Sequence, residues 1–204
     1  ISGFSNIFLF LDKKSWVNFA ILLITFIILI IAMQFLIKKM IYPAPVYQVD
    51  SPPPADLREV ILDTPEDDKI YAWYRQADSG APVILFFHGN GENLQTLWLS
   101  GLLQELDKLN INYLALDYPG YGRSGGTPSE SSLIASGEAA VLWLKKYHHQ
   151  SPLVLCGWSL GASVATLVAA TKPELISGLV LLSPWESLPA IAKDHYPDWM
   201  VNRL

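Results

Sequence analysis

The sequence is poor in cysteine and in charge. Of its 204 residues one is a cysteine, Cys156, and 16% are charged. A single cysteine excludes an internal disulfide and a cysteine-based zinc site. Lys and Arg number 14 against 19 Asp and Glu, a net charge of −5. This acidic balance argues against nucleic-acid binding, which favours a basic face. No metal-binding constellation, cofactor motif or internal repeat is present in the pattern, so no metal and no cofactor is implied.

Charge is missing altogether from residues 15–37, between Lys14 and Lys38. As a helix rising about 1.5 Å per residue, this block is about 34 Å long, enough to cross a hydrocarbon core about 30 Å thick. It is longer than the apolar core of a signal peptide, about 7–15 residues, and no small-residue cleavage site follows it. We predict a single-pass transmembrane helix in a lipid bilayer, with a buried core helix as the alternative. Lysines flank both ends, so the side of the membrane that holds the rest stays open.

The remaining residues divide into three parts. Residues 1–14 precede the helix, and the proline-rich residues 38–55 favour an extended, stiff linker. We assign the domain to residues 56–204. The 162 residues that follow the first 42 are enough for one domain with a core, but they fall short of the roughly 200–250 residues that a large α/β domain may need. Because the chain also begins with isoleucine, we expect it to be incomplete at both ends.

Short apolar runs alternate with helical patterns through this domain. A hairpin is expected first, at residues 59–62 and 70–75. Four apolar runs follow, at 82–89, 111–117, 152–159 and 176–184, with helical patterns at 92–109, 129–147 and 160–171. The alternation predicts an α/β fold with a mostly parallel sheet covered on both faces. Each run ends in polar or small residues, which places the candidate site at the carboxyl edge of the sheet.

The sharpest motif is G-x-S-x-G at residues 157–161. It stands between an apolar run and an alanine-rich helical pattern, the context of a nucleophile elbow. Gly157 and Gly161 would leave room for a tight turn at Ser159, and the helix N-terminus would face developing negative charge. Trp158 is a candidate lining of an acyl pocket. The alternative is a plain glycine-rich turn with Ser159 as a helix N-cap.

An acyl-transfer serine also needs an oxyanion hole. One donor is expected to be the backbone N–H of Leu160, the residue after the nucleophile. The second is expected from the loop at residues 88–93, where we choose the N–H of Asn90. Gly89 and Gly91 would let this backbone approach a substrate and adopt positive φ. His88, at a strand end, is interpreted as a brace for the loop rather than as the catalytic base.

Three motifs together resemble the α/β-hydrolase superfamily. They are HGNG at residues 88–91, LDYPGYGRSGG at 116–126 and GWSLG at 157–161. Within it the chain is similar to the branch of membrane-anchored, serine aminopeptidase-like and lysophospholipase-like hydrolases, over about residues 59–184. The resemblance implies the α/β-hydrolase fold and a structural loop beside the site that contains Asp117.

The same resemblance implies a catalytic acid and then a histidine downstream of the serine. Only His195 follows Ser159, in a region that resembles the start of a cap, so we expect it to be a cap residue. The acid, the catalytic histidine and the last strands are then expected beyond Leu204, and the chain by itself is expected to be inactive, because a serine without a base is a weak nucleophile.

Two functions follow from these observations. The first is a membrane-anchored serine hydrolase that cleaves an ester, thioester or amide of a small acyl-type substrate through an acyl-enzyme on Ser159. The alternative is a catalytically dead hydrolase fold that serves as a scaffold or binding protein on a membrane. The downstream sequence would separate them, because the enzyme needs an acid and a histidine there.

Overall fold

A computed structural model describes residues 12–46, 52–66, 68–78 and 80–184 of the chain. The chain divides into two units, Ile1–Ile41 and Tyr42–Leu204.

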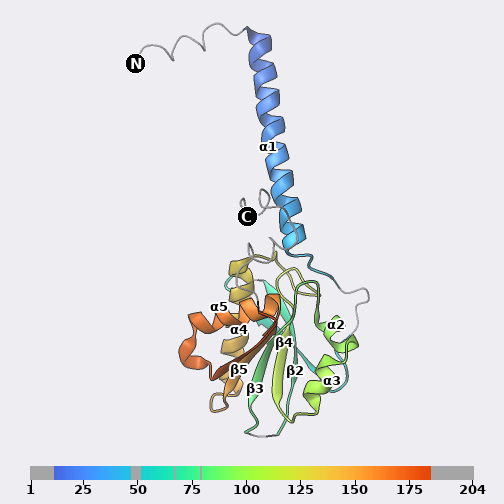
Figure 1. Ribbon diagram of the computed structural model, residues 1–204, viewed down its shortest axis with the longest axis vertical. Coiled ribbons are helices and arrows are strands. Elements are labelled where there is room, and N and C mark those ends of the chain that lie inside the picture. The colour runs from blue at the N-terminus through green and yellow to red at the C-terminus, as the bar shows by residue number, and fades with distance from the viewer. Residues whose placement is uncertain (1–11, 47–51, 67, 79, 185–204) are drawn as a thin grey trace. The chain divides into compact units, whose positions relative to one another are not determined.

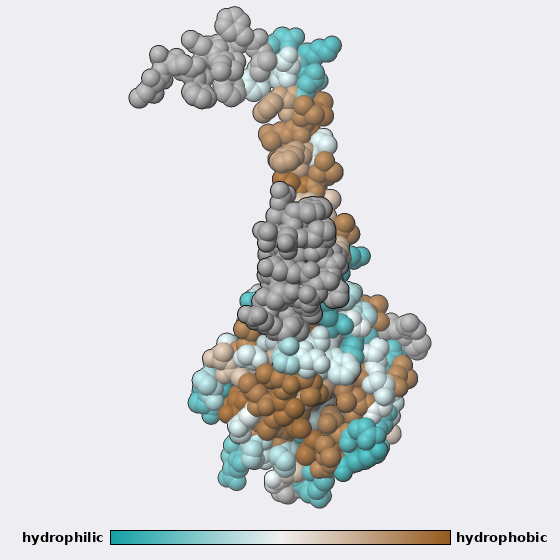
Figure 2. Space-filling view, viewed as in Figure 1, coloured by the Kyte–Doolittle hydropathy of each residue, from teal (hydrophilic) through white to brown (hydrophobic). Residues whose placement is uncertain are grey.

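Helix α1 (Lys13–Ile41) makes up the described part of the first unit. It begins after Asp12, whose Oδ1 accepts the Ser15 N–H at 2.9 Å. None of its residues is buried, and Figure 2 shows apolar residues over the part of the helix that is in view. In the described part of the chain it is the one helix long and apolar enough to cross a membrane. It extends beyond the predicted span of 15–37 at both ends. At the C-terminal end it can continue past residue 37 because the first residue that interrupts helical hydrogen bonding is Pro43.

The second unit is built on a mixed, mostly parallel sheet in the order β1-β2-β4-β3-β5-β6. The first two strands pair antiparallel with each other, and β2 pairs antiparallel with β4; the other neighbours are parallel. This arrangement confirms the predicted α/β class, with the hairpin at one edge. The strands are β1 (Arg58–Asp63), β2 (Lys69–Arg75), β3 (Val83–Phe87), β4 (Asn112–Leu116), β5 (Leu153–Trp158) and β6 (Gly178–Leu182).

Helices cover both faces of the sheet (Figure 1). Helices α4 (Glu130–Tyr147) and α5 (Leu160–Thr171) pack on one face, and α2 (Leu94–Leu99) and α3 (Leu102–Asp107) on the other. A short 3-10 turn, Pro173–Leu175, follows α5.

The prediction of a single helix over 92–109 was wrong, because the structure has two helices there. Gly101 has φ 83°, a left-handed conformation that ends α2 and begins α3 as a separate helix, because glycine reaches this region without steric cost. Helix α2 starts at a capping box formed by Asn93 and Thr96.

Alternate residues of the strands feed the two halves of the core. Leu85 and Phe87 of β3 face α4 and α5, whereas Phe86 faces α2 and α3 together with Tyr113 and Cys156. This alternation follows from the two-residue period of a strand. Burial on both faces fixes the register of β3 and β5, because a one-residue slip would exchange the two faces.

Residues 42–46, which we expected to belong to a spacer, pack against the domain instead. The Pro45 carbonyl accepts hydrogen bonds from the Gly122 N–H at 2.9 Å and from Asn93 Nδ2 at 3.2 Å. Tyr42 and Ala44 pack against the core. The reason for the difference is that a proline removes its own N–H but leaves its carbonyl free to accept.

Candidate active site

Ser159 occupies the turn between β5 and α5. Its φ of 52° and ψ of −119° lie outside the regions that non-glycine residues ordinarily adopt, a strained conformation of the kind found at functional sites. The Ser159 N–H donates to the Leu182 carbonyl of β6 at 3.0 Å. Its side chain makes no capping hydrogen bond to the helix, so the alternative of an ordinary serine N-cap does not describe this turn.

Gly157 and Gly161 allow this turn to be tight. A Cβ on Gly157 would overlap the backbone of Gly161, and a Cβ on Gly161 would overlap the carbonyl of Phe87. No other residue type fits either position without a backbone shift. The elbow is therefore packed directly onto the end of β3, the strand that leads into the loop at 88–93.

The two glycines of that loop differ in their reason for being glycine. Gly91 has φ 82°, in the left-handed region. Gly89 has an ordinary φ but no space, because a Cβ there would overlap the Trp158 indole and crowd the Glu92 carboxylate. The loop backbone and the elbow are thus in direct contact at Gly89 and Trp158.

Hydrogen bonds fix the peptide that links Gly89 to Asn90. His88 Nδ1 lies 2.9 Å from the Gly89 carbonyl oxygen. In a trans peptide the C=O and the following N–H point in opposite directions, so a bond that holds the Gly89 carbonyl also orients the Asn90 N–H. The Asn90 side chain is held separately, by the Tyr121 hydroxyl, which donates to its Oδ1 at 2.8 Å.

The His88 ring is completely buried and neutral. Burial lowers the pKa of His88 to about 4, so at neutral pH Nδ1 carries the proton that it donates to the Gly89 carbonyl. Nε2 lies 4.0 Å from Asp117 Oδ1, which is not an ion pair when the ring is uncharged. The ring packs against Tyr118 and Tyr121, with centroids 4.3 and 5.5 Å away.

Asp117, which follows β4, links the start of α2 to the loop after β4. Its Oδ1 accepts the Leu94 N–H at the start of α2 at 2.8 Å, and its Oδ2 accepts the Arg123 N–H at 3.4 Å. The Arg123 guanidinium in turn bonds Glu59 of β1 at 2.6 Å. These contacts place Asp117 inside a network of loops at the carboxyl edge of the sheet.

The structure brings most of the predicted site residues to the carboxyl edge of the sheet, whereas others lie outside the described residues. Ser159, Leu160 and Trp158 come from the elbow, and the residues of 88–91 from the neighbouring loop. In the part of the chain that the structure describes, no imidazole or carboxylate is hydrogen-bonded to the Ser159 hydroxyl. His195 lies outside the described residues. Sequence reasoning missed Glu92, because nothing in the pattern distinguishes it from a solvated loop carboxylate.

A serine on a strained strand-to-helix turn of an α/β sheet is typical of the α/β-hydrolase fold. The family model described as alpha/beta hydrolase fold matches residues 82–202. The chain belongs to this family, as the three motifs predicted.

Similar proteins include esterases and lipases. Over 174 residues the chain is 34% identical to an uncharacterized protein of Mycobacterium tuberculosis, covering 82% of this chain and 60% of that protein. It is 33% identical over 138 residues to lysophosphatidylserine lipase ABHD12 of Danio rerio, covering 64% of this chain and 35% of the lipase. The chain thus spans between about a third and three fifths of the length of these two relatives.

Solved structures show the same fold. An esterase from Pyrococcus furiosus has a TM-score of 0.60 and 25% identity, with 78% of this chain and 65% of that chain covered. An alpha-beta hydrolase from Vibrio vulnificus has a TM-score of 0.62 and 25% identity, with 73% and 54% covered.

Proposed function

We propose that this chain carries the nucleophile and the oxyanion hole of a serine hydrolase that acts through an acyl-enzyme on Ser159. The observation that supports this most directly is the conformation of Ser159. A positive φ at a half-buried serine whose hydroxyl caps nothing has a steric cost that an ordinary turn would avoid with glycine. An elbow that presents the hydroxyl to a substrate accounts for that cost.

In the proposed reaction, the Ser159 hydroxyl oxygen attacks the carbonyl carbon of the substrate and gives its proton to a general base. The carbonyl oxygen becomes an oxyanion that accepts the N–H groups of Asn90 and Leu160. Each such donor contributes about 3–4 kcal/mol to stabilisation of the transition state. The leaving group departs with a proton, and water then hydrolyses the acyl-serine. Neither the general base nor its acid partner is among the described residues that are hydrogen-bonded to Ser159.

For the substrate we propose a carboxylic ester of a small acyl-type molecule, with thioesters and amides as further candidates. The relatives named a lipase and an esterase support the ester. We further propose that residues 15–37 anchor the protein in a lipid bilayer as a single-pass helix, supported by the length and exposed apolar surface of α1.

A fluorophosphonate probe, which labels activated serines, tests the proposal. It would be applied to the full-length gene product and to this 204-residue chain, both in detergent. We expect labelling of the full-length protein that is lost in Ser159→Ala and kept in Ser131→Ala, a matched change at an exposed serine in the first turn of α4. We expect no labelling of the 204-residue chain.

The other outcomes are equally informative. A folded full-length protein that takes no label would contradict the enzyme and support the alternative of a membrane scaffold or binding protein. Labelling of the 204-residue chain would mean that it contains its own base, and His195 would be the residue to substitute next.

A further inference from the structure

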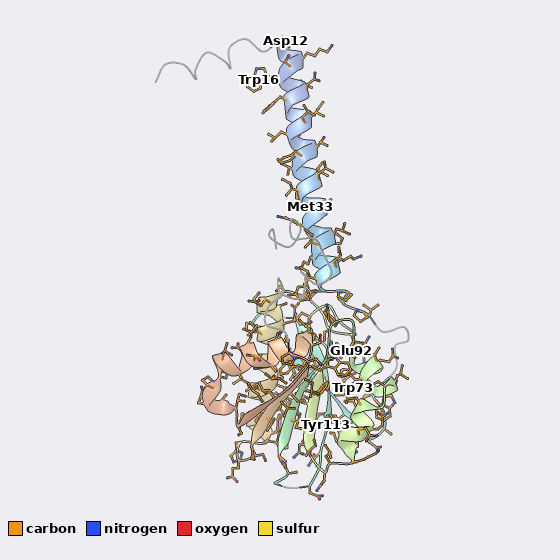
Figure 3. The ribbon with its side chains drawn as sticks, in the orientation of Figure 1. Asp12, Trp16, Met33, Trp73, Glu92 and Tyr113 are labelled. Carbon is orange, nitrogen blue, oxygen red and sulfur yellow. The ribbon has the colours of Figure 1, made fainter. Side chains whose placement is uncertain are left out.

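The Glu92 side chain bridges two segments that are far apart in the sequence. Its Oε2 accepts the Gly89 N–H at 2.7 Å. The Trp158 indole nitrogen, which can only donate, lies beside the same carboxylate against Gly89, and its interaction with the carboxylate lowers the pKa of Glu92. Gly89 lies in the loop after β3, and Trp158 is the last residue of β5. Figure 3 shows Glu92 at one end of the sheet, close to α2, with Tyr113 farther toward the opposite end.

Both partners of Glu92 adjoin a group of the proposed reaction. Gly89 immediately precedes Asn90, and Trp158 immediately precedes Ser159. The indole and the carboxylate fill the space that a Cβ on Gly89 would need, so the two segments meet without a gap. A movement of the loop relative to the elbow would have to separate the indole from the carboxylate or break the hydrogen bond between Gly89 and Glu92.

The Glu92 carboxylate is half-buried, and burial is unfavourable for a charged group. Burial raises the pKa of Glu92, and the interactions with Gly89 and Trp158 act in the opposite direction. Hydrogen bonds to an ionised acceptor are roughly twice as strong as neutral ones, which suits a link between separate segments.

We propose that Glu92 is a positioning residue that clamps the loop at 88–93 to the nucleophile elbow, and thereby sets the separation of the Asn90 and Leu160 N–H groups. This proposal rests on the proposed function. Glu92 touches neither the substrate nor the reacting atoms; it acts through Gly89 and Trp158. The two oxyanion donors come from different segments, so their separation is not fixed by either segment alone.

A purely local role for Glu92 makes a different prediction. The Glu92 N–H donates to the Gly89 carbonyl at 3.4 Å, so the residue also takes part in a turn within the loop. If that turn were its whole purpose, removal of the indole donor would have no effect on the loop. Trp158→Phe keeps an aromatic ring and removes the donor, and it separates the two roles.

The first measurement is the rate of labelling by the fluorophosphonate on the full-length protein. We expect Glu92→Ala to slow it by about 10–100-fold, since a displacement of about 1 Å costs about 100-fold in well-positioned reactions. Trp158→Phe is expected to slow it less. The double variant should be no slower than Glu92→Ala, because both changes break one link. Glu92→Gln, which keeps an acceptor, should be faster than Glu92→Ala.

Glu105→Gln is the matched control, because Glu105 is an exposed glutamate of α3 that pairs with Lys108 at the surface. It should label at the wild-type rate. If Trp158→Phe labels at the wild-type rate, or if Glu92→Ala and Glu92→Gln both label faster than wild type, the clamp is refuted. The second result would mean that the negative charge opposes the oxyanion and holds nothing in place.

The second measurement does not depend on activity. Hydrogen exchange of the amides in residues 88–93 is followed in the same variants. We expect faster exchange at Gly89 in Glu92→Ala and in Trp158→Phe, and no change in Glu105→Gln. If wild type takes no label but the exchange result holds, the proposed function fails and the clamp stands as a structural link. If wild type is labelled and Trp158→Phe changes neither measurement, the function stands and the clamp fails.

Discussion

Acidification is expected to destabilise the domain through His88. The ring is completely buried, and burial lowers its pKa to about 4, whereas in the unfolded chain it titrates near 6.5. Below pH 6.5 the unfolded state therefore binds a proton that the folded state refuses. The contribution of His88 to the free energy of unfolding is complete above pH 6.5 and is lost as the pH falls toward 4.

The size of this loss follows from the two pKa values. The interval from 6.5 to about 4, at 1.36 kcal/mol for each pH unit, amounts to about 3 kcal/mol. By pH 5 about 2 kcal/mol of it is already gone. This is a large share of the 5–15 kcal/mol that is typical of a domain. His88 Nε2 has no hydrogen-bond partner in the described structure, and Asp117 Oδ1, 4.0 Å away, is too far to accept a hydrogen bond from a protonated ring.

Two measurements check this prediction. Urea unfolding of wild type and His88→Gln between pH 7.5 and 4.5 should give a free-energy difference that shrinks by about 2 kcal/mol by pH 5. NMR titration of the four histidines should show one ring, absent in His88→Gln, that stays neutral down to about pH 4. Equal pH slopes for the two proteins, or a His88 ring that titrates near 6.5, would show that burial does not control this group.

Three further changes have definite expected outcomes. Asp117→Ala leaves the buried Leu94 N–H without its carboxylate at 2.8 Å, and urea unfolding should show a loss of about 2–3 kcal/mol, whereas no loss would mean that water replaces the carboxylate. Gly161→Ala places a Cβ onto the backbone of β3, so we expect misfolded protein or, in any folded fraction, no labelling by the probe; a folded variant with normal labelling would contradict the close packing. Ser129→Ala removes the side-chain acceptor of the Ser132 N–H at 3.1 Å, and the free energy of unfolding should fall by about 1 kcal/mol, with an unchanged value showing that the cap is not needed.

The sequence predicts strands β3, β4 and β5 well, because they are largely buried between the helices and appear as unbroken apolar runs. The expected run at 152–159 contains β5, and the run at 111–117 contains β4. The break at Gly101 was missed because the leucine spacing of 92–109 continues across it. Apolar periodicity reports which side faces the core, but it does not report a left-handed residue within the segment.

The candidate site divides in the same way. The elbow was predictable because the turn at Ser159 demands glycine at 157 and 161, and that demand is visible in the sequence. The contact between Glu92 and Trp158 at Gly89 was not predictable, since it joins residues 66 positions apart through their side chains. The docking of residues 42–46 was missed for a similar reason, because the acceptor involved is a backbone carbonyl that every residue possesses.

The docked residues 42–46 have a practical consequence for preparing a water-soluble version. A shortened chain that begins at residue 56, where the proline-rich stretch ends, would lose the carbonyl that accepts the Gly122 N–H and would expose the core surface covered by Tyr42. A chain that begins at Tyr42 keeps both and leaves behind the apolar helix. The boundary at which the second unit can be detached therefore lies at the end of α1 rather than at the end of the prolines.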